Sequence, residues 1–248
     1  MYLQEVFNQL SEGELTQTNL GTVTEDKWSR VVNHINLGLG DLFKRFFLRE
    51  GRLKMQLLAG QTSYPLDVKY ATANTRSKIV EASRFILDSA AARFAGDVLK
   101  VEKVLTEDGF ELGFNSGTSR WPILVTDTAP PTLLVHADIV GQSSDLPEEM
   151  RTSLLEVVYR ARHPKIDIEA AGFDPERYEV KLPDSHLQAL LYYVASRALG
   201  PVGMGQAEGV SSAGYWQRYE AECAQLTLAG VQIDQSEGYD KLRDRGFV

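Results

Sequence analysis

LPDSHLQALLYYVASRALG, at residues 182–200, is the stretch that decides the fold. Its apolar residues recur every three or four positions, which predicts a helix with one buried face. A glycine-containing connection follows, and then YWQRYEAECAQL at 215–226 repeats the helical period before Gly230 ends it. Each short helix has one apolar face that it cannot bury alone, so both need partners elsewhere in the chain.

The expected partners lie near the amino terminus. WSRVVNHINLGLGDLFKRFFLREG, at 28–51, predicts a long helix over 24–47, with Gly51 just past its end. Two glycines inside this helix are expected to permit the close approach of a neighbouring helix. A shorter helix is expected within residues 2–16. We expect five large side chains from the three longer helical regions to be well buried: Trp28, Phe43, Leu190, Val194 and Trp216.

Between the helical regions the apolar residues follow the period of strands. We expect strands at 52–58, 63–68, 97–105, 110–114, 132–139 and 154–161. The sequence therefore predicts the α+β class, with a helical bundle built from both chain ends and an inserted β-rich domain. The expected bounds are 1–51 and 182–230 for the bundle, 52–181 for the insertion and 231–248 for a C-terminal tail.

Charge is unevenly distributed. The net charge of −8 argues against a protein that coats duplex DNA, because phosphate neutralisation requires a basic surface. Residues 106–149 contain eight acidic residues and one arginine. A local basic patch is a candidate contact for phosphate or for an acidic partner, although basic residues also compensate the dipole at a helix C-terminus. Its members are Lys44, Arg45, Arg49, Arg52 and Lys54.

No segment suggests a membrane or secretion. The first twenty residues lack the basic stretch and the following apolar stretch of a signal peptide. No apolar run approaches the ~18 residues of a membrane span. We therefore expect a soluble protein that is made in the cytoplasm and has no membrane partner.

The sequence shows no pattern typical of catalysis or of metal binding. Cys223 is the single cysteine, expected in a helix core, and the four histidines lack metal-ligand spacing. The residue types of a catalytic triad occur together at Asp184, Ser185 and His186. Three consecutive side chains point in different directions, so they are not expected to form a triad. We predict no catalytic residue, cofactor or metal. Two alternatives stay open: a hydrolase that uses carboxylates in the β insertion, and a binding β-module on a helical stalk.

The helices quoted above, together with LLEVVYRARHPKI at 154–166, resemble head-to-tail adaptor proteins of tailed bacteriophages, the connector group that includes tail tubular A-like proteins. The resemblance implies a structural virion protein at the head-tail junction. It implies a ring, commonly of twelve copies, that docks on the portal protein, links it to a downstream tail or nozzle protein and lines part of the DNA channel. Genomic DNA would pass without sequence-specific binding, and no catalytic residues are carried over.

The tail at 231–248 is the expected docking arm. It combines charged residues with apolar anchors, and an aromatic residue near its end suggests burial against a partner. The candidate contacts with the portal or a neighbouring copy are Val231, Ile233, Tyr239, Leu242, Phe247 and Val248.

Overall fold

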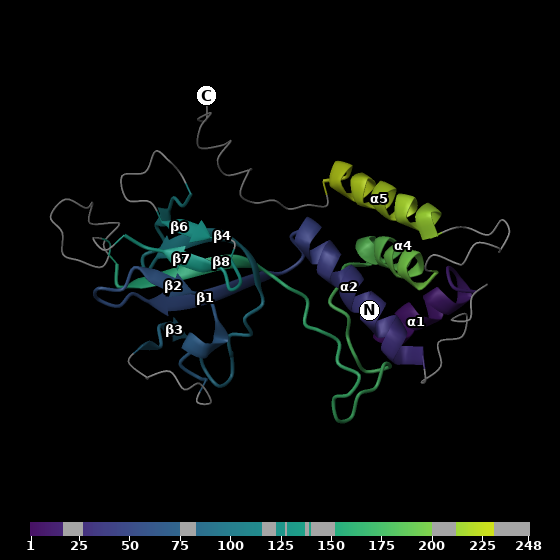
Figure 1. Cartoon of the computed structure of the whole chain (residues 1–248), viewed down its shortest axis with the longest axis horizontal. Helices are drawn as coiled ribbons and strands as arrows, with labels where there is room; N and C mark the ends of the chain where they lie inside the picture. The colour runs from purple at the N-terminus through teal and green to yellow at the C-terminus, as the bar shows by residue number, and fades with distance from the viewer. Residues whose placement is uncertain are drawn as a thin grey trace. The chain divides into compact units, whose positions relative to one another are not determined.

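The computed structural model describes residues 1–16, 27–74, 83–115, 123–126, 128–136, 139, 152–199 and 212–230. The chain divides into two compact units (Figure 1). One comprises Met1–Leu48 and His163–Val248, and the other Arg49–Arg162. We call them the helical unit and the sheet unit. Within the described ranges, no helix is long and apolar enough to cross a bilayer.

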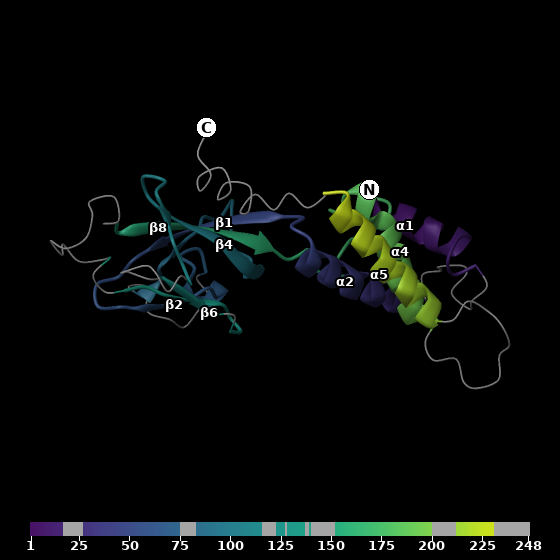
Figure 2. The same ribbon diagram turned by 90° about the horizontal axis from the view of Figure 1, so that it is seen from above.

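Among its described residues, the helical unit contains four α-helices: α1 (Leu3–Glu12), α2 (Trp28–Arg45), α4 (Leu187–Ala198) and α5 (Ser212–Leu228). A short 3₁₀ turn, η5 (Asp184–His186), leads into α4. Helix α4 contacts each of the other three helices, and Figures 1 and 2 show α5 lying beside it. The most apolar helix therefore lies at the centre of the unit.

Close packing of α2 on α4 depends on Gly38. A Cβ atom at Gly38 would lie 2.7 Å from Leu190 Cδ1 and 2.9 Å from Tyr193 Cδ1, whereas one at Gly40 would meet nothing within 4 Å. The predicted close approach is thus found at the first glycine and is absent at the second. Three predicted core residues of this unit are fully buried: Phe43, Leu190 and Val194.

The prediction for Trp216 was wrong, because its side chain is 40% exposed. The buried stripe of α5 begins at the preceding residue and consists of Tyr215, Tyr219, Cys223 and Leu226. The ring of Trp216 packs at the rim, 6.1 Å from Tyr193 and 5.3 Å from Tyr219 between centroids. The buried face therefore starts at Tyr215 rather than at Trp216, while Tyr219, Cys223 and Leu226 are buried as the helical period predicts. The side chain of Trp28 lies outside the described part of the chain.

An irregular segment after residue 163 belongs to the helical unit. Leu3 N donates to Tyr178 O at 2.9 Å, and Val180 N donates to Met1 O at 2.9 Å, so the segment fixes the start of α1. The side chain of Asn36 on α2 donates to Ile166 O at 3.0 Å and accepts from Ile166 N at 2.9 Å. These bonds explain why the second part of the helical unit begins at His163. The sequence pattern had placed that beginning at residue 182.

In the part of the sheet unit that the structure describes, the strands form two antiparallel sheets. The first has the order β3-β1-β8-β4-β5 and the second β2-β7-β6. The structure as a whole is therefore α+β, which confirms the predicted class. The strand bounds are β1 Glu50–Gln56, β2 Ser63–Pro65, β3 Ile86–Leu87, β4 Val98–Thr106, β5 Glu111–Leu112, β6 Leu124–Thr126, β7 Thr132–Leu134 and β8 Leu154–Ala161, with a 3₁₀ turn, η2, at Val68–Tyr70.

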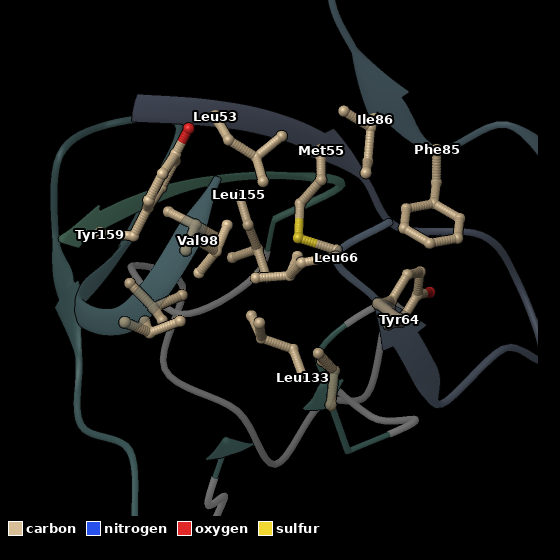
Figure 3. Packing of buried hydrophobic residues seen from close by; sticks show 14 of the residues in the cluster. Leu53, Met55, Tyr64, Leu66, Phe85, Ile86, Val98, Leu133, Leu155 and Tyr159 are labelled. Carbon is tan, nitrogen blue, oxygen red and sulfur yellow. The ribbon is translucent and has the colours of Figure 1, made fainter. Parts of the chain in front are cut away.

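The core of the sheet unit lies between the two sheets. Alternate residues of β1 point inward, so Leu53 and Met55 are buried while their neighbours are exposed. Figure 3 shows them with Leu155 of β8 and Leu133 of β7 on the same core. This unit thus has a hydrophobic core of its own.

Two local predictions in this region were wrong. Helix α2 ends at Arg45, where Phe46 turns to an extended conformation, and Gly51 is part of β1 rather than a helix cap. The predicted strand at 132–139 is limited to Thr132–Leu134. In contrast, β8 has the predicted bounds of 154–161.

Candidate functional site

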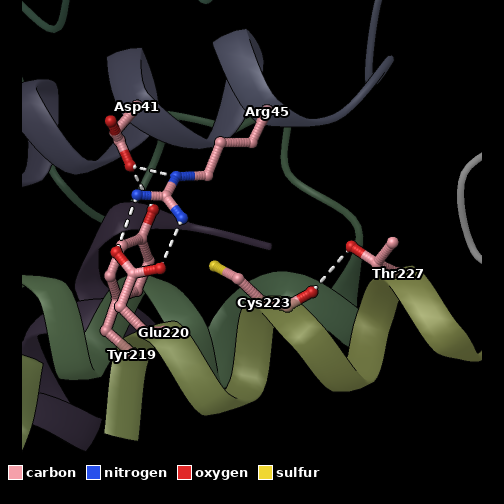
Figure 4. Close-up of polar contacts among 6 residues, drawn as sticks. All are labelled: Asp41, Arg45, Tyr219, Glu220, Cys223 and Thr227. Atoms are coloured by element: carbon pink, nitrogen blue, oxygen red, sulfur yellow. Dashed lines mark hydrogen bonds and ion pairs between the residues drawn. The ribbon is translucent and has the colours of Figure 1, made fainter. Parts of the chain in front are cut away.

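A polar cluster in the described part of the helical unit joins α2 to α5 (Figure 4). Both terminal nitrogens of Arg45 donate to the carboxylate of Glu220 at 2.8 Å. Arg45 Nε donates to Asp41 at 2.8 Å, and the hydroxyl of Tyr219 donates to the same carboxylate. The guanidinium also lies over the Tyr219 ring, 5.1 Å from its centroid. Two helices far apart in sequence are therefore joined by one network.

The electrostatics of this cluster favour a structural role. The hydrogen bond from Arg45 lowers the pKa of Glu220, and the same contact raises the pKa of Arg45, so both remain charged at neutral pH. Burial, followed by the bond to Asp41, raises the pKa of Tyr219, which keeps its hydroxyl as a donor. Because each group is already engaged, the network holds α5 against α2. Its partly exposed ion pairs contribute modestly, roughly 1 kcal/mol or less each.

A second network lies at the start of β1 in the sheet unit. Arg49 Nη1 lies 3.1 Å from Asp97 Oδ2 and donates to Arg162 O at 2.9 Å. The other oxygen of Asp97 accepts from the Tyr159 hydroxyl at 3.0 Å. Burial and then the negative charge of Asp97 raise the pKa of Tyr159, so that hydroxyl stays protonated. Arg49 thus ties the first strand to the end of the last strand.

The five residues of the basic patch have different surroundings. Arg45 and Arg49 belong to the two networks above. Arg52 pairs with Glu50 at 2.7 Å and with Glu156 at 3.3 Å, whereas Lys44 and Lys54 are exposed. Three arginines of the patch therefore already face carboxylates. A contact of the patch with phosphate or with an acidic partner remains a prediction.

The structure brings Ser185 and His186 together without forming a triad. Ser185 Oγ lies 3.0 Å from His186 Nδ1, but the imidazole is fully buried and its Nε2 atom has no hydrogen-bond partner. The ring packs edge-on against Phe46, with centroids 4.8 Å apart. This histidine is a core residue that a substrate cannot reach.

Burial lowers the pKa of His186, and burial followed by the charges of Arg30 and Arg197 lowers the pKa of His34. Both ring nitrogens of His34 are also buried and have no hydrogen-bond partner among the described residues. Protonation therefore favours the unfolded chain, where a histidine keeps its ordinary pKa of 6.5. The stability that depends on neutral imidazoles is complete above that pH and is lost as the pH falls from it towards the lowered folded-state pKa.

We therefore expect the helical unit to melt at a lower temperature at about pH 5.5 than at about pH 7.5. Thermal unfolding followed by circular dichroism measures the difference. A variant with His34→Gln and His186→Gln should show a smaller dependence on pH over this interval. Equal or greater stability of the unchanged protein at the acidic pH would contradict the assignment.

Other candidates have simpler outcomes. Cys223 is buried, as predicted, and burial raises the pKa of its thiol. Glu107 and Asp108 are exposed in the turn between β4 and β5, and Glu111 lies 3.7 Å from Lys103. Among the described residues, no group of three His, Cys, Asp or Glu side chains could hold a metal ion. The six candidate contacts at 231–248 lie outside the described residues.

Comparison with known proteins decides the family. The sequence profile of the SU10 adaptor protein family matches residues 11–242, nearly the whole chain. The chain belongs to the SU10 adaptor protein family. The resemblance to head-to-tail adaptor proteins is thereby confirmed. Among solved structures, a chain from the "Virion of native gene transfer agent (GTA) particle" is 10% identical, with a TM-score of 0.25 and 88% of each chain covered. No curated protein matches the sequence.

Membership of the SU10 adaptor family identifies a phage structural adaptor and points to a structural role rather than to catalysis. The residues that organise this adaptor were only partly predictable. Asp41 and Arg45 are four positions apart on one helix, a spacing that favours an ion pair. Glu220 is 175 positions from Arg45, and Asp97 is 62 positions from Tyr159, so no local pattern could reveal those contacts.

Proposed function

We propose that this adaptor forms a ring of twelve copies, the number common among head-to-tail adaptors. The ring docks on the portal protein at the head-tail junction and connects it to the next tail or nozzle protein. The observation that carries the proposal is the family match over residues 11–242. In this proposal, the helices that precede the sheet unit in the sequence and those that follow it form one bundle. This bundle is the repeating element of the ring.

The distribution of charge supports a place beside the DNA path. A channel surface should let DNA slide, and a surface that neutralised many phosphates would hold it. The net charge of −8 and the acidic stretch at 106–149 fit a wall that repels the duplex. Genomic DNA is therefore proposed to pass through the ring without sequence-specific binding.

The segment after α5 is the proposed portal-docking arm. Helix α5 is followed by Gly230, whose φ of +66° is a common way to end a helix. The remaining residues, 231–248, carry six apolar or aromatic anchors. Ordering each residue costs roughly 1–2 kcal/mol in backbone entropy, so a partner surface that buries these anchors is needed to offset that cost.

Deleting residues 231–248 is expected to abolish co-purification with the portal protein while leaving the thermal melt nearly unchanged. The melt should survive because the buried stripe of α5 ends at Leu226, before the deletion. Affinity capture on immobilised portal measures binding, and circular dichroism measures the melt.

The matched control keeps the length of the arm and replaces only Phe247 and Val248 with serine. It should bind the portal more weakly than the full chain and more strongly than the truncated chain. Full affinity of the truncated protein for the portal would refute the docking role of this segment.

A further inference from the structure

Helix α2 carries a stripe of residues that faces away from the helical unit. Its members are Arg30, Asn33, Leu37, Gly40 and Lys44, spaced by alternating steps of three and four as along a helix–helix seam. All except Gly40 are exposed, and Leu37 is 53% exposed. A Cβ atom at Gly40 would meet nothing within 4 Å, so another helix can approach closely there. The stripe contains two basic residues and no acidic residue.

Helix α1 carries a shorter stripe of the opposite charge. Glu5, Asn8 and Glu12 follow the same alternation of three and four, and all three are exposed. One oxygen of Glu5 accepts from Tyr2 N at 2.9 Å. The helix contains no lysine or arginine among its 10 residues. The exposed stripe of α1 therefore carries two negative charges and no positive charge.

Both stripes are exposed, although both helices contact α4. The residues of each stripe therefore stay accessible within a single copy. They can be covered between copies in a head-to-tail contact, which generates a ring when the rotation between copies closes.

We propose that the α1 stripe of one copy docks on the α2 stripe of the next copy. Helix α1 is about 15 Å long, and the α2 stripe spans about 21 Å from Arg30 to Lys44. The acidic helix thus fits between basic residues, with Leu37 as the apolar anchor near the middle. The opposite charges favour pairing of these two faces, and the buried leucine adds affinity. This inference rests on the proposed function, since it identifies the contact that closes the proposed ring.

Charge reversal tests the contact without disturbing the fold. Glu12→Lys places a positive charge at the C-terminus of α1, and Arg30→Glu places a negative charge near the N-terminus of α2. Both new charges interact favourably with the helix dipole, so neither is expected to destabilise its helix. Each variant alone should self-associate at least about tenfold more weakly than the unchanged protein, as measured by sedimentation velocity. An equimolar mixture should recover association, because each variant then meets its complement. Unchanged self-association of both single variants, or no recovery in the mixture, would overturn the proposal.

A cysteine pair tests the geometry and separates this inference from portal docking. The only native cysteine is buried, so Asn8→Cys together with Asn33→Cys introduces one exposed thiol on each stripe. Mild oxidation of the concentrated protein without portal should give a ladder of dimers and larger multimers, and either single variant should stop at dimers. A ladder from a protein that fails to bind the portal would support this contact and refute the docking role. Portal binding without a ladder would refute this contact alone.

Discussion

Leu190→Asp is expected to unfold the helical unit. Leu190 is fully buried on α4, and its Cδ1 atom lies where a side chain at Gly38 would have to fit. An aspartate there forces a carboxylate without a partner into an apolar helix contact, which should cost more than about 4 kcal/mol. Hydrogen exchange read by mass spectrometry should show loss of protection in peptides from α2 and α4.

The control for this change is Leu37→Asp. It makes the same substitution within a helix of the same unit, but at a side chain that is 53% exposed. It should change the free energy of unfolding by less than about 1 kcal/mol, mostly through helix propensity. It should also weaken the contact between copies proposed above. Normal exchange protection in Leu190→Asp would mean that α4 is not the centre of the unit.

The sequence could predict the features that depend on short-range pattern. Strand β8 was predicted with its observed bounds because residues 154–161 are rich in β-branched and apolar side chains. The helical period likewise predicted α4, although it gave no sign that this helix contacts the other three. What could not be predicted is which of two adjacent residues at the edge of a helix face is buried. Tyr215 and Trp216 are adjacent aromatic residues, and only the packing of α5 on α4 decides which of them is buried.

Gly51 shows a second limit of sequence reasoning. A glycine after a long amphipathic helix is typical of a helix end, so the pattern favoured that interpretation. In the structure Gly51 pairs with Tyr159 across β1 and β8. A Cβ atom there would lie 2.3 to 2.7 Å from three atoms of the Tyr159 side chain. The residue that requires glycine at this position thus lies 108 positions later in the chain (159 minus 51). A prediction from neighbouring residues alone cannot include it.

Gly51→Ala is consequently expected to destabilise the sheet unit by about 3 kcal/mol. The tyrosine ring cannot move aside easily, because its side chain is buried and its hydroxyl donates to Asp97 at 3.0 Å. Asp97 is held in turn by Arg49. Chemical denaturation followed by hydrogen exchange in β1 and β8 peptides measures the loss.

The physical cause can be tested with a double-mutant cycle. In a Tyr159→Leu background the ring is absent, so adding Gly51→Ala should cost little, and the coupling energy between the two positions should reach about 1–3 kcal/mol. Gly113→Ala is the matched control in the same unit, since a Cβ atom there would meet nothing within 4 Å. That change should stay within about 0.5 kcal/mol of the unchanged protein. An equal penalty for Gly51→Ala with and without the tyrosine ring would show that backbone conformation, and not the cross-strand contact, requires glycine at this position.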